Sequence, residues 1–357
     1  MSSRLASDRL GAVRLIPARL FAALALGAGL VAAGPAAAQE TKIRFQLDWR
    51  FEGPAALFTL LAKKGYFKDE KLDVVIDAGN GSGGTITRVA TGTYDMGFAD
   101  MAALMEFWGN NPAAPSKPVA VMMVYNNTPA AVLALKKSGI KTPADLVGKK
   151  LGAPVFDAGR KAFPIFAKAN GIDLAKINWT AMDPPLRETM LVRGDIDAIT
   201  GFYFTSLLNL NARGVKDEDI VVLPYPQFGV KLYGNVVIVA EDFLKKNPEA
   251  VKAFLRAFTK GVKDVIADPA AGVASVKDRD ALIDTALETR RLKLALAGSV
   301  VTPDAKAEGF GDINGPRMAL MASQVNDAFG LKERVQPDRL FVTGLLPSKD
   351  QRNIFAK

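Results

Sequence analysis

The chain of 357 residues contains no cysteine and no histidine. It therefore has no disulfide, no thiol nucleophile, no thiolate or imidazole metal ligand and no histidine proton relay, which excludes most hydrolases and metalloenzymes. With 49% hydrophobic and 23% charged residues, the chain is neither disordered nor fibrous. Its length predicts two domains, each with its own core.

The beginning of the chain has the pattern of a secretory leader. Four arginines precede an uncharged run at residues 20–35, which ends in Ala36, Ala37 and Ala38. This run is shorter than the roughly 20 apolar residues that a membrane-spanning helix needs, so we interpret residues 1–38 as a cleaved signal peptide. An uncleaved membrane anchor is the alternative. We expect an exported, periplasmic protein.

The net charge is +9, and about +6 remains after the leader is removed. Lysine and arginine occur singly or in pairs, with aspartate and glutamate between them. The sequence has no arginine-rich tract and no aromatic RNA-binding motif, so we expect no nucleic-acid partner. An anionic ligand or a solvated basic surface explains the charge better.

The hydrophobic pattern predicts two similar α/β lobes. Strands are expected at residues 42–47, 72–76 and 94–98, with helices between them, as in parallel βαβ units. About a hundred residues later the same order returns, with strands at 150–155, 177–182 and 196–201. Both lobes are therefore predicted to be doubly wound.

Two crossings of the chain should join these lobes. We expect the first lobe to contain residues 41–127 and about 236–357, including a helical tail, and the second to contain residues 128–235. The crossings would lie near residues 126–133 and 230–236. A double crossing forms a hinge, which allows the lobes to close around a solute. We expect a monomer.

Ligands of such sheets bind beyond the carboxyl ends of the strands, so the loops there hold the candidate site. In the first loop, Trp49 offers a ring for stacking, and Asp48 and Glu52 offer carboxylates. Each of these residues also has a structural alternative. Trp49 could lie at the edge of the core, Asp48 could cap a backbone amide, and Glu52 could stabilise the helix start through the helix dipole.

A glycine-rich loop is the most specific signal in the chain. Its amides can turn inward to form a cradle for an anion or a hydrogen-bond acceptor, supported by the following helix N-terminus; we assign to this cradle Gly81, Ser82, Gly83, Gly84 and Thr85. It is neither a Walker loop nor a dinucleotide fingerprint. A flexible turn is the alternative.

Further candidates follow other strands. Asp100 is a helix cap that can also face a ligand, and Asp157 caps the corresponding helix of the second lobe. The remaining candidates are a cation at a helix start and three aromatic residues: Arg160, Phe202, Tyr203 and Tyr233, the last placed on the second crossing where it can close over the cleft.

The sequence gives no support for catalysis. Asp48 and Glu52 could serve an exported carboxylate-dependent enzyme, which is the alternative function, but no nucleophile has a base beside it. No loop has the alternating oxygen ligands of a calcium site. We expect no cofactor and no metal.

Four segments resemble the type II periplasmic substrate-binding proteins of the nitrate, sulfonate and taurine, and thiamine-pyrimidine uptake family. They are LDW at 47–49, KGYFKDE at 64–70, YDMGFAD at 94–100 and LVGKKLG at 146–152. The resemblance implies a two-lobed receptor that delivers a solute to the permease of an ATP-driven importer in the inner membrane. It also implies a cleft lined by the loop at residues 48–49, the glycine loop and the facing loops of the second lobe.

The chain departs from its pyrimidine-binding relatives after the Asp-Trp pair. Those relatives usually have Asn and His soon afterwards, where this chain has FEGP at 51–54. The related eukaryotic pyrimidine synthases use a histidine and a cysteine-rich iron motif, which this chain lacks.

We therefore expect a receptor whose ligand has an acceptor or anionic group held by residues 82–85 and Arg160. The flat or cationic part of the ligand would lie against Trp49, Glu52 and Phe202. Sulfonates or taurine-like zwitterions, aromatic acids and pyrimidine-like heterocycles all fit.

Overall fold

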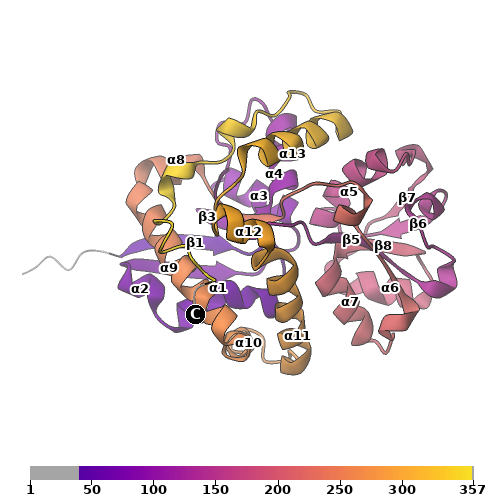
Figure 1. The fold of residues 1–357 in the computed structure, drawn as a ribbon, viewed down its shortest axis with the longest axis horizontal. Coiled ribbons are helices and arrows are strands. Elements are labelled where there is room, and N and C mark those ends of the chain that lie inside the picture. Colours follow the sequence, from indigo (N-terminus) through magenta and orange to yellow (C-terminus); the bar gives the residue numbers. More distant parts are fainter. Residues whose placement is uncertain (1–39, 356–357) are drawn as a thin grey trace, which may run out of the picture. The chain divides into compact units, whose positions relative to one another are not determined.

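Two five-stranded sheets organise the computed structural model, which describes residues 40–355 (Figure 1). The predicted leader, residues 1–38, lies outside the described residues. The first sheet has the order β2-β1-β3-β10-β4, with β1 (Thr41–Gln46), β2 (Leu72–Asp77), β3 (Met96–Asp100), β4 (Val119–Met123) and β10 (Asn235–Val239). The second has the order β7-β6-β8-β5-β9, with β5 (Ala130–Leu135), β6 (Lys150–Gly152), β7 (Asn178–Thr180), β8 (Ala198–Phe202) and β9 (Ile220–Pro224).

The predicted pair of similar lobes is confirmed. We call the part built on the first sheet the first lobe and the part built on the second sheet the second lobe. In the first lobe, the strands β1, β2 and β3 are followed by α1 (Ala56–Lys63), α3 (Ser82–Ala90) and α4 (Met101–Asn110). In the second lobe, β6, β7 and β8 are followed by α5 (Ala158–Ala169), α6 (Arg187–Arg193) and α7 (Tyr203–Asn211).

Strand direction is mixed in both sheets. The pairs of β1 with β2 and β3 are parallel, as are those of β6 with β7 and β8, which agrees with the βαβ prediction. By contrast, β10 is antiparallel to β3 and β4, and β5 is antiparallel to β8 and β9. The chain enters β5 and β10 from the other lobe, so these two strands run against their neighbours.

The two crossings lie side by side. The Gly234 N–H donates to the Tyr125 carbonyl at 2.8 Å, and the Thr128 N–H donates to the Leu232 carbonyl at 3.2 Å. A Cβ at Gly234 would lie 2.8 Å from the Cβ of Tyr125, so this close approach requires glycine. The predicted double crossing is therefore confirmed.

The helical tail contacts both lobes. It contains α8 (Glu241–Lys246), α9 (Pro248–Ala267), α10 (Pro269–Lys277), α11 (Thr285–Ala295), α12 (Pro303–Glu308) and α13 (Gly315–Ala328). Helices α9 and α10 pack on α1 of the first lobe, and α9 also packs on the short helix α2 (Tyr66–Asp69). Helix α11 contacts the 3-10 turn at Gly53–Ala55 and also α7, and α13 contacts α4 and α5.

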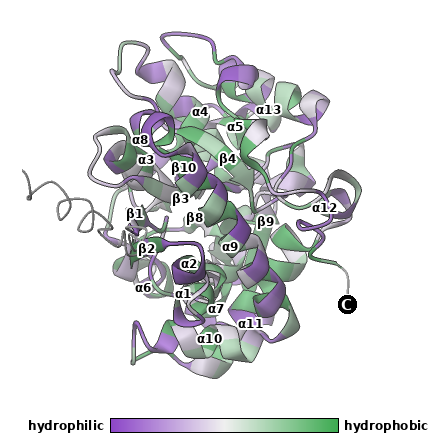
Figure 2. Cartoon of the chain, turned by 90° about the vertical axis from the view of Figure 1, so that its left-hand side faces the viewer, coloured by the Kyte–Doolittle hydropathy of each residue, from purple (hydrophilic) through white to green (hydrophobic). Residues whose placement is uncertain are grey.

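Helix α9 illustrates how the sequence positions the tail. Pro248 starts this helix, where its missing N–H is tolerated, and the apolar side chains recur at helical spacing. Figure 2 shows polar and apolar residues alternating along it. Its buried Phe254 stacks on Phe45 of β1, with ring centroids 5.2 Å apart. Burial of this face attaches the tail to the first sheet.

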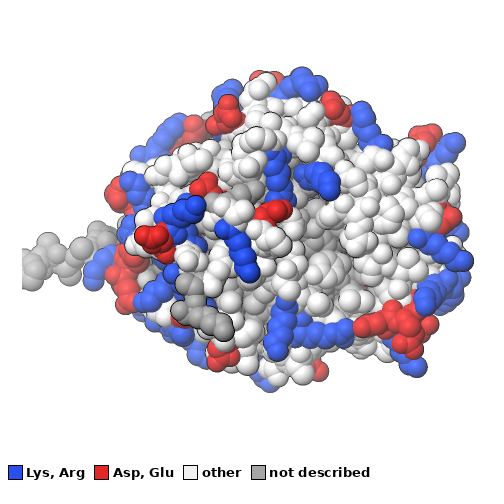
Figure 3. Space-filling view, in the orientation of Figure 1, with Lys and Arg blue, Asp and Glu red and all other residues white. Residues whose placement is uncertain are grey.

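Surface charge on the face shown in Figure 3 is dispersed, with basic side chains lying singly or in small groups among acidic ones. Within residues 40–355, no helix combines the length and apolar character required to cross a bilayer.

Candidate functional site

A cavity between the lobes lies where the sequence placed the site. About 560 Å³ of space there is free of protein atoms, but much of it is open to solvent, and the enclosed part is narrow because the lobes are closed on each other. The first lobe contributes mainly the loop after β1, the start of α3 and the end of β3. The second lobe contributes the loop after β6, the start of α6 and the end of β8.

Aromatic rings form much of the wall. The ring centroids of Phe98 and Tyr125 lie 5.2 Å apart in an edge-to-face arrangement, and the Tyr125 ring is 6.2 Å from that of Phe202. The aromatic residues in the lining are Trp49, Phe58, Phe98, Tyr125, Phe202 and Phe204. Both lobes therefore contribute aromatic rings to the lining, where a flat ligand can contact them.

Asp48 is the carboxylate of the first-lobe wall. Asn235, at the start of β10, donates through Nδ2 to Oδ2 of Asp48 at 2.8 Å. Burial raises the pKa of Asp48 to about 7; the Asn235 hydrogen bond opposes this rise, whereas Asp100 and Glu52 add to it. Beside it, Nε1 of Trp49 is buried and has no hydrogen-bond partner among the described residues.

Asp100 lies behind the wall. Its Oδ1 accepts the Ala103 N–H at 3.0 Å and so caps α4, while its own N–H donates to Ser82 Oγ at 3.0 Å. Burial raises the pKa of Asp100 to about 7, against the opposing backbone hydrogen bonds at the helix start. Of the two roles considered for Asp100, the helix cap is the one observed.

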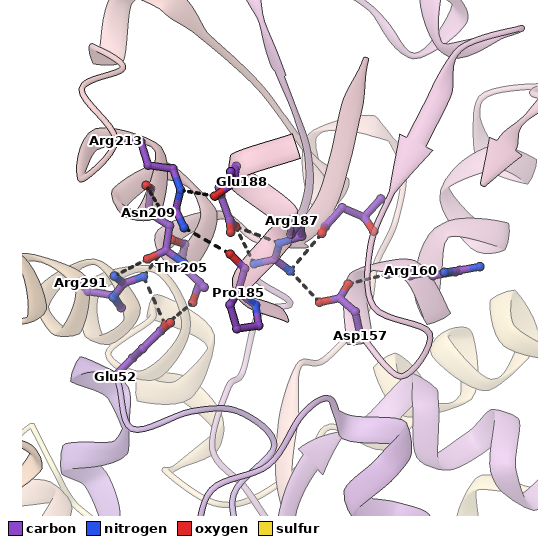
Figure 4. A network of polar contacts seen from close by, with 12 residues as sticks. Glu52, Asp157, Arg160, Pro185, Arg187, Glu188, Thr205, Asn209, Arg213 and Arg291 are labelled. Atoms are coloured by element: carbon purple, nitrogen blue, oxygen red, sulfur yellow. Dashed lines mark hydrogen bonds and ion pairs between the residues drawn. The ribbon is translucent and has the colours of Figure 1, made fainter. Parts of the chain in front are cut away.

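Arg187 was missed by the sequence reasoning and is the buried cation of the second-lobe wall. Its guanidinium is within 3.1 Å of Asp157 and 2.8 Å of Glu188, and it donates to the Thr200 carbonyl (Figure 4). The Arg187 Cζ atom lies 5.1 Å from the centre of the Trp49 ring in the other lobe. Burial raises the pKa of Asp157, although Arg187 opposes the rise.

Glu52 belongs to a second buried ion cluster. Its Oε2 lies 3.2 Å from Nη1 of Arg291, and Thr205 of the second lobe donates to the same oxygen at 3.1 Å (Figure 4). Arg291, on tail helix α11, also pairs with Glu288 at 2.9 Å and donates to the Thr205 carbonyl at 2.8 Å. One arginine of the tail thus connects both lobes.

The glycine loop does not form the expected cradle. The N–H of Gly81 donates to the Asp48 carbonyl at 2.7 Å, and the N–H of Gly83 donates across the cleft to the Phe156 carbonyl at 3.2 Å. The amides of Gly84 and Thr85 both donate to the Gly81 carbonyl. The Gly84 and Thr85 amides are occupied because they belong to the first turn of α3, which begins at Ser82.

Gly81 instead permits close contact between the lobes. Its φ is +134°, and a Cβ there would lie 2.3 Å from the carbonyl oxygen of Phe156 in the second lobe. Only glycine fits this position without displacing the facing backbone.

Three predicted site residues lie away from the cavity. Arg160 donates to the Ala153 carbonyl at 2.9 Å and stacks on Trp179 of β7, at 4.7 Å. Tyr203 donates to the Leu294 carbonyl at 3.0 Å. The Tyr233 hydroxyl accepts a hydrogen bond from the Asn314 N–H, and the Arg317 guanidinium carbon lies 4.0 Å from the centre of the Tyr233 ring. These two tail residues hold Tyr233 outside the cleft.

Half of the fourteen predicted residues line the cavity: Asp48, Trp49, Glu52, Gly81, Ser82, Asp157 and Phe202. Gly83, Gly84, Thr85 and Asp100 lie next to the lining, and Thr85 Oγ1 donates to the Leu47 carbonyl. The missed lining residues include the aromatic residues Phe58, Phe98, Tyr125 and Phe204, and Arg187.

The fold is shared with solved periplasmic binding proteins. The alkanesulfonate-binding protein SsuA of Xanthomonas axonopodis pv. citri, bound to MOPS, matches with a TM-score of 0.68 at 13% identity. The match covers 86% of this chain and 100% of that one. The predicted type II periplasmic binding protein fold is confirmed.

Similar sequences include both a synthase and a binding protein. The 4-amino-5-hydroxymethyl-2-methylpyrimidine phosphate synthase of Aspergillus parasiticus is 27% identical over 72% of this chain and 76% of its own length. The riboflavin-binding protein RibY of Chloroflexus aurantiacus is 27% identical over 60% of this chain and 59% of its own. The family model described as NMT1/THI5 like matches residues 56–272, more than half of the sequence. The chain therefore belongs to the NMT1/THI5-like family.

Proposed function

We propose that the protein is a periplasmic receptor that holds a small, flat solute between its lobes and delivers it to an ATP-driven importer of the inner membrane. The observation that carries this proposal is the cavity lined by aromatic rings from both lobes. A ligand in contact with both walls stabilises the closed arrangement, which is how a hinged receptor signals occupancy.

Aromatic heterocycles fit this cavity better than aliphatic sulfonates do. Six aromatic side chains line it, whereas four of the glycine-loop amides, those of Gly81, Gly83, Gly84 and Thr85, already donate to protein carbonyls. The ability of the relative RibY to bind riboflavin, as its name states, supports a flat ligand.

An exported enzyme remains the second candidate because the pKa of Asp48, raised to about 7, suits proton transfer. The cavity offers no histidine or cysteine to act with it. Turnover decides between the two functions: a receptor returns its ligand unchanged, and an enzyme does not.

A thermal-shift screen of residues 39–357 against pyrimidines, flavins, aromatic carboxylates and sulfonates tests the proposal. At a hundredfold excess over the Kd, we expect a bound ligand to add about 2.7 kcal/mol of stability and to raise Tm by several degrees. Chromatography of the released ligand should recover it unchanged. Saturable stabilisation without turnover supports the receptor, and a changed product contradicts it.

Two tryptophans provide a matched pair of variants. Trp49 lines the cavity beneath Arg187, and Trp179 lies beneath Arg160 outside it. We expect Trp49→Leu to weaken binding about tenfold or more through lost stacking, and Trp179→Leu to leave the Kd unchanged. Equal effects of the two substitutions would place the ligand elsewhere.

A further inference from the structure

Carboxylates outnumber guanidinium groups in the buried part of the candidate site. Arg187 and Arg291 are each 1% exposed. Six acids lie in the cavity wall or directly behind it: Asp48, Glu52, Asp100, Asp157, Glu188 and Glu288. Arg50, a further cation in the lining, is exposed to solvent.

Both buried arginines are already paired with two acids each. Arg187 pairs with Asp157 and Glu188, and Arg291 pairs with Glu52 (Figure 4). Arg291 also pairs with Glu288. Each cluster therefore has one negative charge in excess when its acids are ionised. In a desolvated wall, this excess repels an anion and attracts a cation.

Asp48 and Asp100 add to the excess, because neither makes an ion pair within the described part of the chain. Asp100 is occupied by its helix cap, whereas Asp48 lines the cavity. The Asn235 amide holds Oδ2 of Asp48, so this carboxylate is already oriented before a ligand arrives.

We propose, on the basis of the receptor function above, that the cleft selects a flat cation, such as an amidinium or a protonated aminoheterocycle, whose N–H groups pair with Asp48. Anions of the same shape are rejected. The aromatic rings contact the flat face of the ligand, and the acids select for its positive charge. They do so because a desolvated carboxylate binds a cationic N–H donor more strongly than a neutral one.

The protonation of Asp48 makes the selection depend on pH. Burial raises its pKa to about 7, the Asn235 amide opposes this rise, and the neighbouring acids Asp100 and Glu52 add to it. Arg187 and Arg50 line the same cavity, and the buried Tyr125 phenol has a pKa raised well above its usual value and remains neutral. Below pH 7 the protonated Asp48 attracts a cation less.

Three benzene derivatives of nearly equal shape test the charge preference in the whole mature chain. Benzamidine is cationic, benzamide is neutral and benzoate is anionic at pH 8. Isothermal titration calorimetry at pH 8 should give benzamidine an affinity about tenfold or more above that of benzamide, with no measurable binding of benzoate. Lowering the pH from 7 to 5 should reduce the affinity for benzamidine toward that for benzamide and leave the affinity for benzamide unchanged.

Two variants of equal net charge complete the experiment. Asp48→Asn should reduce the affinity for benzamidine to the affinity for benzamide. Asp242→Asn, on the exposed surface of α8, should leave the affinity for benzamidine unchanged. Circular dichroism checks that both variants are folded. Any of three results would overturn the inference: benzoate binds as tightly as benzamidine, benzamidine does not bind, or Asp48→Asn leaves the affinity for benzamidine unchanged. If the inference failed but another compound bound and was released unchanged, the receptor function would stand. Chemical conversion of a bound compound would contradict the receptor function.

Discussion

At the residue scale, the wall of the cleft carries acids whose protonation is coupled to folding. The pKa values of Asp48 and Asp100 are raised from 3.8 to about 7 by burial. Between pH 4 and pH 7 the folded protein therefore binds protons that the unfolded chain has released. Their contribution to the free energy of unfolding is greatest at low pH and declines as the pH rises through this window.

Asp48→Asn should remove part of this dependence. The uncharged amide fits the same place and can still accept from Asn235. We expect it to raise the free energy of unfolding by about 4 kcal/mol at pH 8 and by less than half of that at pH 5. Urea unfolding at both pH values measures this difference. A variant that is less stable than the wild type at pH 8 would contradict the expected role of desolvation.

At the scale of elements, α11 completes the cleft from the far end of the chain. Its consecutive arginines have different environments: Arg291 is buried between two glutamates, whereas the half-exposed Arg290 pairs with the half-exposed Asp217. A buried charge that loses its partner is much more destabilising than the loss of a surface pair.

The two arginines supply a matched test. Arg291→Gln leaves Glu52 and Glu288 facing each other without a cation and should reduce the free energy of unfolding by about 3–5 kcal/mol at pH 8. Arg290→Gln should cost less than about 1 kcal/mol. The loss in Arg291→Gln should be smaller at pH 5, because burial raises the pKa of Glu288 and this carboxyl protonates more easily there. Equal losses in both variants by urea unfolding would refute a specific role for Arg291.

The elements were more predictable than the side chains they bring together. Period-two and helical patterns located β1 and α9, and the capping acids Asp100 and Asp157 marked true helix starts. The strands β5 and β9 were not predicted; AAVLAL and IVVLP are continuous apolar runs, a pattern that does not by itself distinguish a strand from a buried helix.

Arg187 and Arg291 could not be identified as site residues from sequence. Each lies in a helix among other charged residues, where local spacing resembles an ordinary solvated surface. Their burial depends on packing between segments far apart in the chain. The occupied amides of the glycine loop could not be foreseen either, because nothing local indicates that Phe156 of the other lobe accepts one of them.

At the scale of the whole molecule, direct contacts hold the lobes together across the cleft. Besides the backbone hydrogen bond from Gly83 to Phe156, Lys161 of the second lobe pairs with Glu106 of the first at 3.0 Å. These contacts describe a closed receptor, and opening the cleft would break them.

Gly81→Ala should prevent this closure. The new Cβ would overlap the Phe156 carbonyl, so the ligand affinity should fall about tenfold or more, and ligand should no longer reduce the radius of gyration in X-ray scattering. Gly92→Ala is the control, because Gly92 also has positive φ, +73°, but has open space around it. A Gly81→Ala protein that closes and binds like the control would exclude this contact as a determinant of closure.

The position of Arg291 also determines when the protein can first capture its solute during biosynthesis. Glu52 is made early by the ribosome, but the guanidinium that neutralises it and fastens Thr205 arrives almost two hundred and forty residues later. A nascent or prematurely terminated chain that stops before α11 has both walls of the cleft and no fastening between them. The two walls of the cleft are therefore joined through Arg291 only when the last fifth of the polypeptide has been made.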